Sequence, residues 1–155
     1  MPPSRVTHQV EVVSVSSVSS YGGTVYTQSI VVEFQSDEQL TVFDSEALVP
    51  NNTTGESIEI ALALGTFADA TPTNDERGVF KPEKGSEWTY DVVGELSIVD
   101  GGESGSDQMR MVDTGSIRFL VSNFSDLHNR TSDDAELVEE RWWFSQSRAD
   151  LYRVL

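Results

Sequence analysis

The chain has 155 residues, and its 26 Asp and Glu far outnumber its 10 Lys and Arg, which gives a formal net charge of −16. Leu, Ile, Val and Phe exceed about one fifth of the residues, so composition excludes a disordered acidic segment. The absence of cysteine excludes disulfides, thiolate metal sites and a cysteine nucleophile. We therefore expect a single folded domain over residues 1–155, with residues 1–7 as a flexible tail.

Alternation of polar and apolar residues predicts strands in the first two thirds of the chain. The first covers residues 9–18, where the valines change parity between Val12 and Val13 as a β-bulge requires. A glycine-containing turn at 21–23 leads to a second strand at 24–34, and a short third follows at 39–43. After a loop at 50–56, the segments 57–64 and 88–98 each predict a strand with one buried face.

The rest of the chain is less regular. Residues 67–86 contain two prolines and two glycines and predict the longest irregular stretch. Strands are expected at 109–112 and 116–121, joined by a turn at 113–115, and from about 136 to 154. Acidic residues ahead of Arg141 allow a short helix within 125–141. The pattern therefore predicts seven to nine strands and at most one short helix.

Many short strands joined by glycine-rich turns predict an all-β domain, and we favour a small antiparallel β-barrel over a sandwich. Two features resemble the oligonucleotide/oligosaccharide-binding fold (OB-fold): the loop leading into the strand Gly55–Ile60, and Gly94 within a long strand, where a glycine allows a bend at a barrel corner. The same features also suit a lipocalin-like or other up-and-down barrel.

The excess of acidic over basic residues indicates a protein adapted to concentrated salt. At molar salt the Debye length falls to about 3 Å, so neighbouring carboxylates barely repel each other. Only two lysines, Lys81 and Lys84, are present, whereas a hyperthermophilic protein is enriched in lysine. The composition resembles that of halophilic archaeal proteins. The sequence has no apolar run of signal-peptide length or of membrane-spanning length, so we expect a cytoplasmic protein that does not contact a membrane.

No recognised catalytic or cofactor-binding motif is present. His8 and His128 are far apart and are interpreted as surface residues, and there is no HExxH, GxSxG, GxxxxGK[ST] or GxGxxG pattern. We therefore predict no catalytic residues and no cofactor, and we favour a protein that is not an enzyme.

One acidic loop has the composition of a cation site. Asp100, Glu103 and Asp107 stand among glycines and offer oxygen ligands for a hard cation such as Ca²⁺. The loop lacks the twelve-residue EF-hand pattern, so a plain hairpin tip is the preferred interpretation and no metal is predicted.

The segment 141–153 concentrates aromatic and arginine side chains, and it supplies the candidate binding residues. On a strand, adjacent tryptophans point to opposite faces, so at least one ring should enter the core. Aromatic rings interleaved with arginine suit a protein contact, and they also suit a platform for single-stranded nucleic acid. The candidates are Trp142, Trp143, Arg148, Tyr152 and Arg153.

Three functions remain open. The first is a non-enzymatic β-barrel module that binds a protein partner or associates with itself. The second is an OB-like protein that binds single-stranded nucleic acid, which requires the candidate residues to share one exposed face. The third is a small barrel enzyme or ligand carrier, which requires a pocket with a buried carboxylate of raised pKa.

Overall fold

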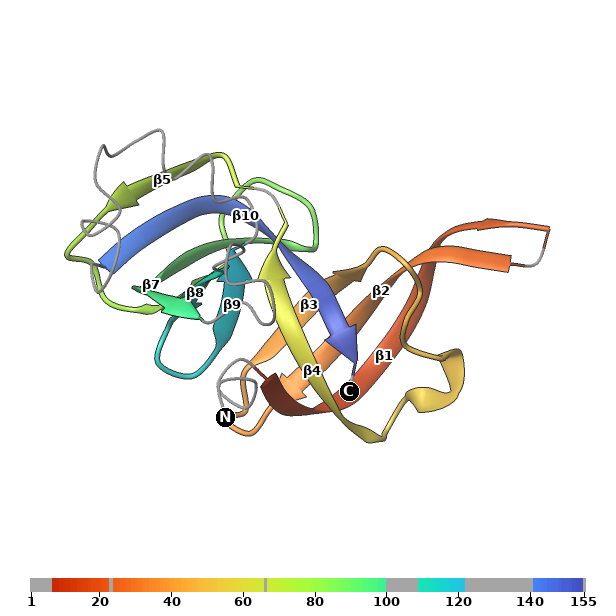
Figure 1. The fold of residues 1–155 in the computed structure, drawn as a ribbon. Helices are drawn as coiled ribbons and strands as arrows, with labels where there is room; N and C mark the ends of the chain where they lie inside the picture. Colours follow the sequence, from red (N-terminus) through yellow and green to blue (C-terminus); the bar gives the residue numbers. More distant parts are fainter. Residues whose placement is uncertain (1–6, 23, 66, 100–108, 122–140, 155) are drawn as a thin grey trace.

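The computed structural model of the chain describes residues 7–22, 24–65, 67–99, 109–121 and 141–154. These residues form ten strands and one 3₁₀ turn, so the predicted all-β class is confirmed (Figure 1). The elements are β1 (Thr7–Tyr21), β2 (Thr24–Phe34), β3 (Gln39–Asp44), η1 (Asn51–Thr53), β4 (Ser57–Leu64), β5 (Asp69–Pro72), β6 (Gly78–Phe80), β7 (Thr89–Val99), β8 (Met109–Asp113), β9 (Arg118–Val121) and β10 (Arg141–Val154).

Eight of these strands close into one barrel, in the order β10-β3-β2-β1-β4-β9-β8-β7. An additional pairing between β4 and β10 divides the closed sheet into two five-stranded rings that share these two strands. Figure 1 shows β10 running from the side of β5 and β7 to the side of β1 and β3, with β4 beside its second half. The long final strand therefore belongs to both halves of the molecule.

The barrel is mixed, which corrects the antiparallel prediction. Most neighbouring strands are antiparallel, but β10 pairs in parallel with β3, where Asp150 lies opposite Phe43. β4 also pairs in parallel with β9, where Ala63 and Leu64 lie opposite Leu120 and Val121. Each parallel pair joins segments that are distant in the sequence. Alternation within a strand sets its buried face but carries no information about the direction of such a neighbour.

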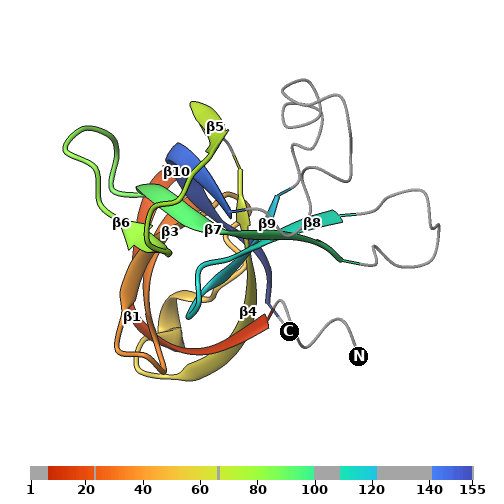
Figure 2. The same cartoon turned by 90° about the vertical axis from the view of Figure 1, so that its left-hand side faces the viewer.

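The strand count also exceeds the predicted seven to nine. Two short strands, β5 and β6, lie within residues 67–86, which were expected to be irregular. β5 pairs with β10 and β6 pairs with β7, so both occupy the outer ends of the sheet (Figure 2). Between β6 and β7, the Lys81 ammonium donates to the carbonyls of Ser86, Glu87 and Thr89, which holds this turn closed.

Two local predictions can be compared with the structure: the bulge in β1 and the glycine bend in β7. The β1–β2 register shifts between Val12 and Ser14, so the expected bulge is confirmed with Val13 as the extra residue. At Gly94 on β7, an added Cβ would lie 2.5 Å from the Asp113 carbonyl oxygen. A glycine is therefore required there because β8 approaches β7 closely, which gives the bend a physical cause.

The core fills both rings with aliphatic and aromatic side chains. On β4, Ile60, Leu62 and Leu64 are buried as predicted, and Ala61 and Ala63 of the opposite face are buried too, because both faces are covered where β4 is shared by the rings. The largest buried apolar side chains are Trp142, Phe119, Phe144, Ile30, Ile60, Leu62, Leu64, Leu96 and Ile117.

Two further expectations concern parts of the chain outside the described residues. The short helix proposed within 125–141 falls almost wholly in 122–140, and the acidic loop with Asp100, Glu103 and Asp107 falls in 100–108. Among the residues that the structure describes, no helix is long and apolar enough to cross a membrane.

Candidate functional site

Strand β10 places the two adjacent tryptophans on opposite faces, as the sequence predicted. Trp142 is buried in the core, where its register partners are Gly94 on β7 and Pro72 on β5. Trp143 points outward and is 39% exposed. Since Trp142 lies in the core, only Trp143 of this pair is available to a partner.

Trp143 lies in a shallow groove on the outside of the sheet formed by β5, β10, β7 and β6. Trp143 pairs with Val93 on β7, and Val93 in turn pairs with Gly78 on β6. The Phe80 ring lies against Gly78, where an added Cβ would be only 2.8 Å from the ring, and Phe80 is 47% exposed. This surface, called here the Trp143 groove, is lined by Asp75, Glu76, Phe80, Asp91, Val93 and Trp143.

Three carboxylates surround the aromatic pair. Asp91 lies on the outer face of β7, and its Oδ1 accepts a hydrogen bond of 2.9 Å from the backbone N–H of Gln146, at the irregular point of β10 where Gln146 has φ of 49°. Asp75 and Glu76 are exposed in the segment between β5 and β6. No ion pair engages these three carboxylates among the residues that the structure describes. The groove therefore combines exposed aromatic surface with negative charge.

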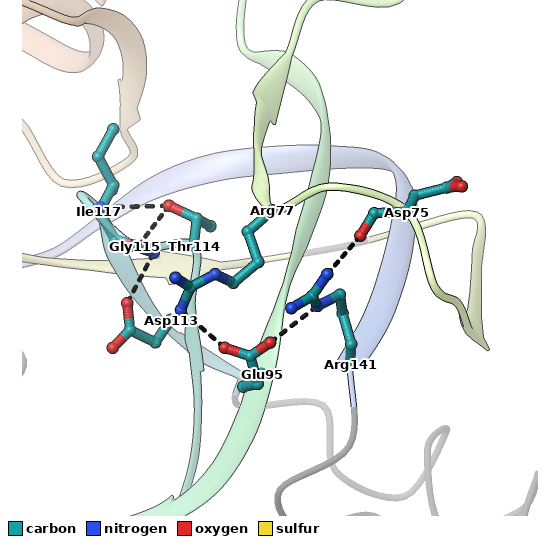
Figure 3. A network of polar contacts seen from close by, with 8 residues as sticks. All are labelled: Asp75, Arg77, Glu95, Asp113, Thr114, Gly115, Ile117 and Arg141. Atoms are coloured by element: carbon teal, nitrogen blue, oxygen red, sulfur yellow. Dashed lines mark hydrogen bonds and ion pairs between the residues drawn. The ribbon is translucent and has the colours of Figure 1, made fainter.

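A charged network beside the groove fixes the segment that carries Asp75. Glu95 on β7 accepts hydrogen bonds from Arg77 Nη1 and Arg141 Nε, both of 2.8 Å. Arg141 Nη1 also donates to the Asp75 carbonyl oxygen at 2.9 Å, and the Asp75 carboxylate points away from that guanidinium (Figure 3). Partial burial raises the pKa of Glu95, but the bonds from Arg141 and Arg77 outweigh it and hold this pKa below its usual range.

The second half of β10 carries the remaining candidate residues in a different environment. Arg148 Nε and Nη2 donate to the Asp150 carboxylate at 2.6 and 2.9 Å, and its guanidinium lies 4.8 Å from the centre of the Phe43 ring. The hydrogen bond that Arg148 donates to the Asp150 carboxylate raises the pKa of Arg148. The Phe43 ring packs in turn against Trp88, with ring centres 4.7 Å apart. The guanidinium of Arg148 is thus committed to contacts within the chain.

Tyr152 and Arg153 lie at the far end of the same strand. Both are exposed, and the Arg153 guanidinium lies 5.8 Å from the centre of the Tyr152 ring. Tyr152 follows Trp143 by nine positions along β10, which is at most about 30 Å of extended chain. The five predicted residues therefore occupy four places: Trp142 the core, Trp143 the groove, Arg148 its contacts with Asp150 and Phe43, and Tyr152 and Arg153 the far end of β10.

Most of the groove was not predicted from the sequence. Phe80, Asp75 and Glu76 fall in the stretch expected to be irregular, and only the pairing of β6 with β7 brings Phe80 towards Trp143. For Asp91 a signal existed, because alternation along 88–98 already placed it on the polar face of its strand. Alternation carries no information about which strands lie on either side of β7.

His8 is buried, which corrects its interpretation as a surface residue. It lies on β1 with its Nε2 accepting the backbone N–H of Arg118 at 3.0 Å, and its ring meets Phe34 edge to face at 5.2 Å. Burial, aided by the nearby Arg118 charge, lowers its pKa to about 4 against an ordinary 6.5. His8 is therefore a neutral structural acceptor near pH 7. His128 is outside the described residues.

Asp44 is the one fully buried carboxylate among the described residues. Its Oδ1 accepts from the Leu48 N–H, and its Oδ2 accepts from the Val49 N–H and from Gln28 Nε2, at 2.8 to 2.9 Å. These bonds tie the loop after β3 to β2. Because hydrogen bonds from the fold itself occupy both carboxylate oxygens, we assign Asp44 a structural role rather than a role in proton transfer.

Metal ligands do not gather within the described part of the chain, where no group of three or more His, Asp or Glu side chains has the spacing of a metal site. The acidic loop that carried the cation hypothesis is outside that part. Comparison of the chain with protein-family models, curated proteins and solved structures finds no match.

Proposed function

We propose that the protein is a non-enzymatic binding module whose Trp143 groove takes a basic segment of a partner protein, in which Arg or Lys stands next to an apolar residue. The observation that carries the proposal is the exposed aromatic pair, Trp143 and Phe80, within a rim of three carboxylates. The proposal is a protein contact at one defined place rather than along the whole of β10.

Charge supports a cationic partner. Arg77 and Arg141 together balance Glu95 and one further carboxylate, so Asp75, Glu76 and Asp91 still leave two net negative charges around the groove. A guanidinium or ammonium over an indole face is worth about 0.5–1 kcal/mol at an exposed site and about 2 when it is desolvated. Burial of apolar surface and cation–π contact persist in concentrated salt, where long-range attraction between charges is screened.

The strand order supports a binding role. The ring β1-β2-β3-β10-β4, closed by β4 against β1, has the order of the five-stranded OB barrel, and this is the basis on which we propose an OB-like relationship. In such barrels the connections between strands one and two and between strands four and five carry ligands. Here the second of these connections contains β5 to β9 and supplies every groove residue except Trp143.

Single-stranded nucleic acid is the second candidate function. It is favoured by the exposed aromatic rings, on which bases stack for about 1–3 kcal/mol each. The groove, however, surrounds its tryptophan with carboxylates, and Arg148 is engaged by Asp150. Phosphate would approach Trp143 against charge, so we place the basic protein segment first.

The test is peptide binding measured in about 2 M KCl, where electrostatic screening is nearly complete. The probe is a blocked peptide of alternating Arg and Leu that carries a neutral fluorophore, followed by fluorescence anisotropy up to about 1 mM protein, the range of weak contacts. Trp143→Ala should weaken binding at least tenfold, because truncating an aromatic side chain that becomes buried by a partner typically costs about 2 kcal/mol or more of binding free energy.

Two controls make the result specific. Tyr152→Ala removes an aromatic side chain of similar exposure from the far end of the same strand, and it should change the dissociation constant less than twofold. A peptide with citrulline in place of Arg keeps the shape and loses the charge, so it should bind more weakly. Equal loss in Trp143→Ala and Tyr152→Ala would overturn the proposal, and so would binding of a mixed-sequence oligonucleotide in preference to the Arg-Leu peptide.

A further inference from the structure

The hairpin of β1 and β2 extends well beyond the barrel. β4 pairs with β1 only from Thr7 to Glu11, and β3 pairs with β2 only from Gln28 to Glu33. The Val12 N–H still donates to the Glu56 carbonyl and the Val12 carbonyl accepts from the Gly55 N–H, and beyond Val12 the register partners of β1 among the described residues all lie on β2, up to the Tyr21–Thr24 pair. Figure 1 shows this end of the hairpin projecting to one side of the molecule. Residues 13–21 and 24–27 are called here the distal arm.

The distal arm has an open edge of unusual length. This open edge belongs to β1, where it covers nine residues, 13–21, and the β2 part of the distal arm has only the four residues 24–27. An open sheet edge has unpaired backbone N–H and C=O groups that can bond to a strand of another molecule. Proteins usually protect such edges with charged side chains or proline. The β1 edge carries neither, and among its described side chains Val13 and Val18 are 36% and 48% exposed.

Charge distribution makes this edge distinctive. Residues 12–32 form 21 consecutive positions without Asp, Glu, Lys or Arg, in a chain where these residues make up 23%. The next longest uncharged stretches, 47–55 and 60–68, have nine residues each. The longest uncharged stretch of the chain therefore contains the whole of the distal arm.

We propose that the distal arm joins two copies of this chain, with the open β1 edges of the copies paired antiparallel about a two-fold axis. Two molecules of charge −16 repel each other wherever their carboxylates face. The distal arm lets them meet with no charge at the contact and with the carboxylate-bearing barrels held apart. A two-fold axis makes one edge complementary to itself, and it joins two hairpins into a four-stranded sheet.

The test is the mass of the protein in about 2 M KCl, where screening is nearly complete, by sedimentation equilibrium over a hundredfold range of concentration. The proposal expects the mass to rise from that of one chain to that of two. Val18→Glu places a carboxylate of each copy within the paired edge and should return the protein to one chain. Leu48→Glu adds the same charge at an exposed leucine outside the distal arm, at 41% exposure, and should leave the dimer intact.

A second variant guards against local misfolding. Replacing residues 18–27 by Asn-Gly closes a two-residue turn between the paired Ser17 and Gln28, which removes the end of the distal arm and keeps the barrel pairings. This variant should be a folded monomer by circular dichroism and sedimentation. A wild-type mass of one chain at every concentration, or a dimer that survives both Val18→Glu and the shortened arm, would overturn the proposal.

This association is independent of the Trp143 groove. Trp143→Ala should leave the dimer unchanged, and the shortened arm should leave binding of the Arg-Leu peptide unchanged. Failure of one proposal is thereby distinguishable from failure of the other.

Discussion

Acid should destabilise the protein through His8. The folded state holds the pKa of this imidazole at about 4, mainly by burial, whereas an unfolded chain returns it to about 6.5. Protonation therefore favours the unfolded chain. The stability contributed by the neutral ring is fully present above pH 6.5 and is lost as the pH falls from 6.5 towards 4.

The magnitude follows from the difference between the two pKa values. At about 1.4 kcal/mol for each pKa unit, the full difference corresponds to about 3 kcal/mol, and most of it is lost by about pH 4.5. Partial access of solvent to the ring reduces the expected loss to about 2 kcal/mol. Arg118 adds to the loss by repelling the imidazolium, while Asp113 opposes it.

The assay is urea unfolding in concentrated KCl between pH 7.5 and 4.5, comparing the wild type with His8→Gln. Glutamine offers an oxygen that accepts the Arg118 N–H and does not titrate, while the carboxylates titrate alike in both proteins. Between these pH values the wild type should lose about 2 kcal/mol more than the variant. Parallel stability curves for the two proteins, or an NMR titration that places the His8 pKa near 6.5, would show that burial of His8 does not make the fold sensitive to acid.

Two further substitutions test the fold. Gly94→Ala should lower the free energy of unfolding in urea by at least about 2 kcal/mol, because its Cβ would meet the Asp113 carbonyl oxygen at 2.5 Å. The control Ser97→Ala, on the same strand, should change this free energy by less than about 1 kcal/mol. A tolerated Gly94→Ala would mean that β7 and β8 do not approach so closely. Asp44→Asn should cost about 2–3 kcal/mol, because an amide N–H₂ replaces an oxygen that accepts from fixed donors, and exposed Asp37→Asn should be nearly neutral; equal stability of the two variants would contradict this role.

Local features of the fold were predictable from the sequence because neighbouring residues determine them. Alternation gave the buried faces of β4 and β7, the change of parity at Val12 and Val13 gave the bulge, and the adjacent tryptophans were expected on opposite faces. Turns at Gly22 and Gly115 were expected from glycine, and these residues have φ of 60° and 104°. Each inference used a window of a few residues.

Non-local features were not predictable in the same way. The pairing of β10 with β3 and β4 joins residues about a hundred positions apart, and the short strands β5 and β6 are held in the sheet by β10 and β7. His8 was expected at the surface because a lone polar residue at a strand start gives no sign that Arg118 and Phe34 will cover it. The Trp143 groove depends on the same long-range pairing, so the sequence alone identified Trp143 as a binding candidate and placed Asp91 only on the polar face of its strand.

The most direct measurement of the central claim is the anisotropy titration of the Arg-Leu peptide against wild-type protein, Trp143→Ala and Tyr152→Ala in concentrated KCl. We expect saturable binding that weakens at least tenfold in Trp143→Ala and less than twofold in Tyr152→Ala. Absence of saturable binding to the wild type, or equal affinity of all three proteins, would contradict a cationic binding groove at Trp143.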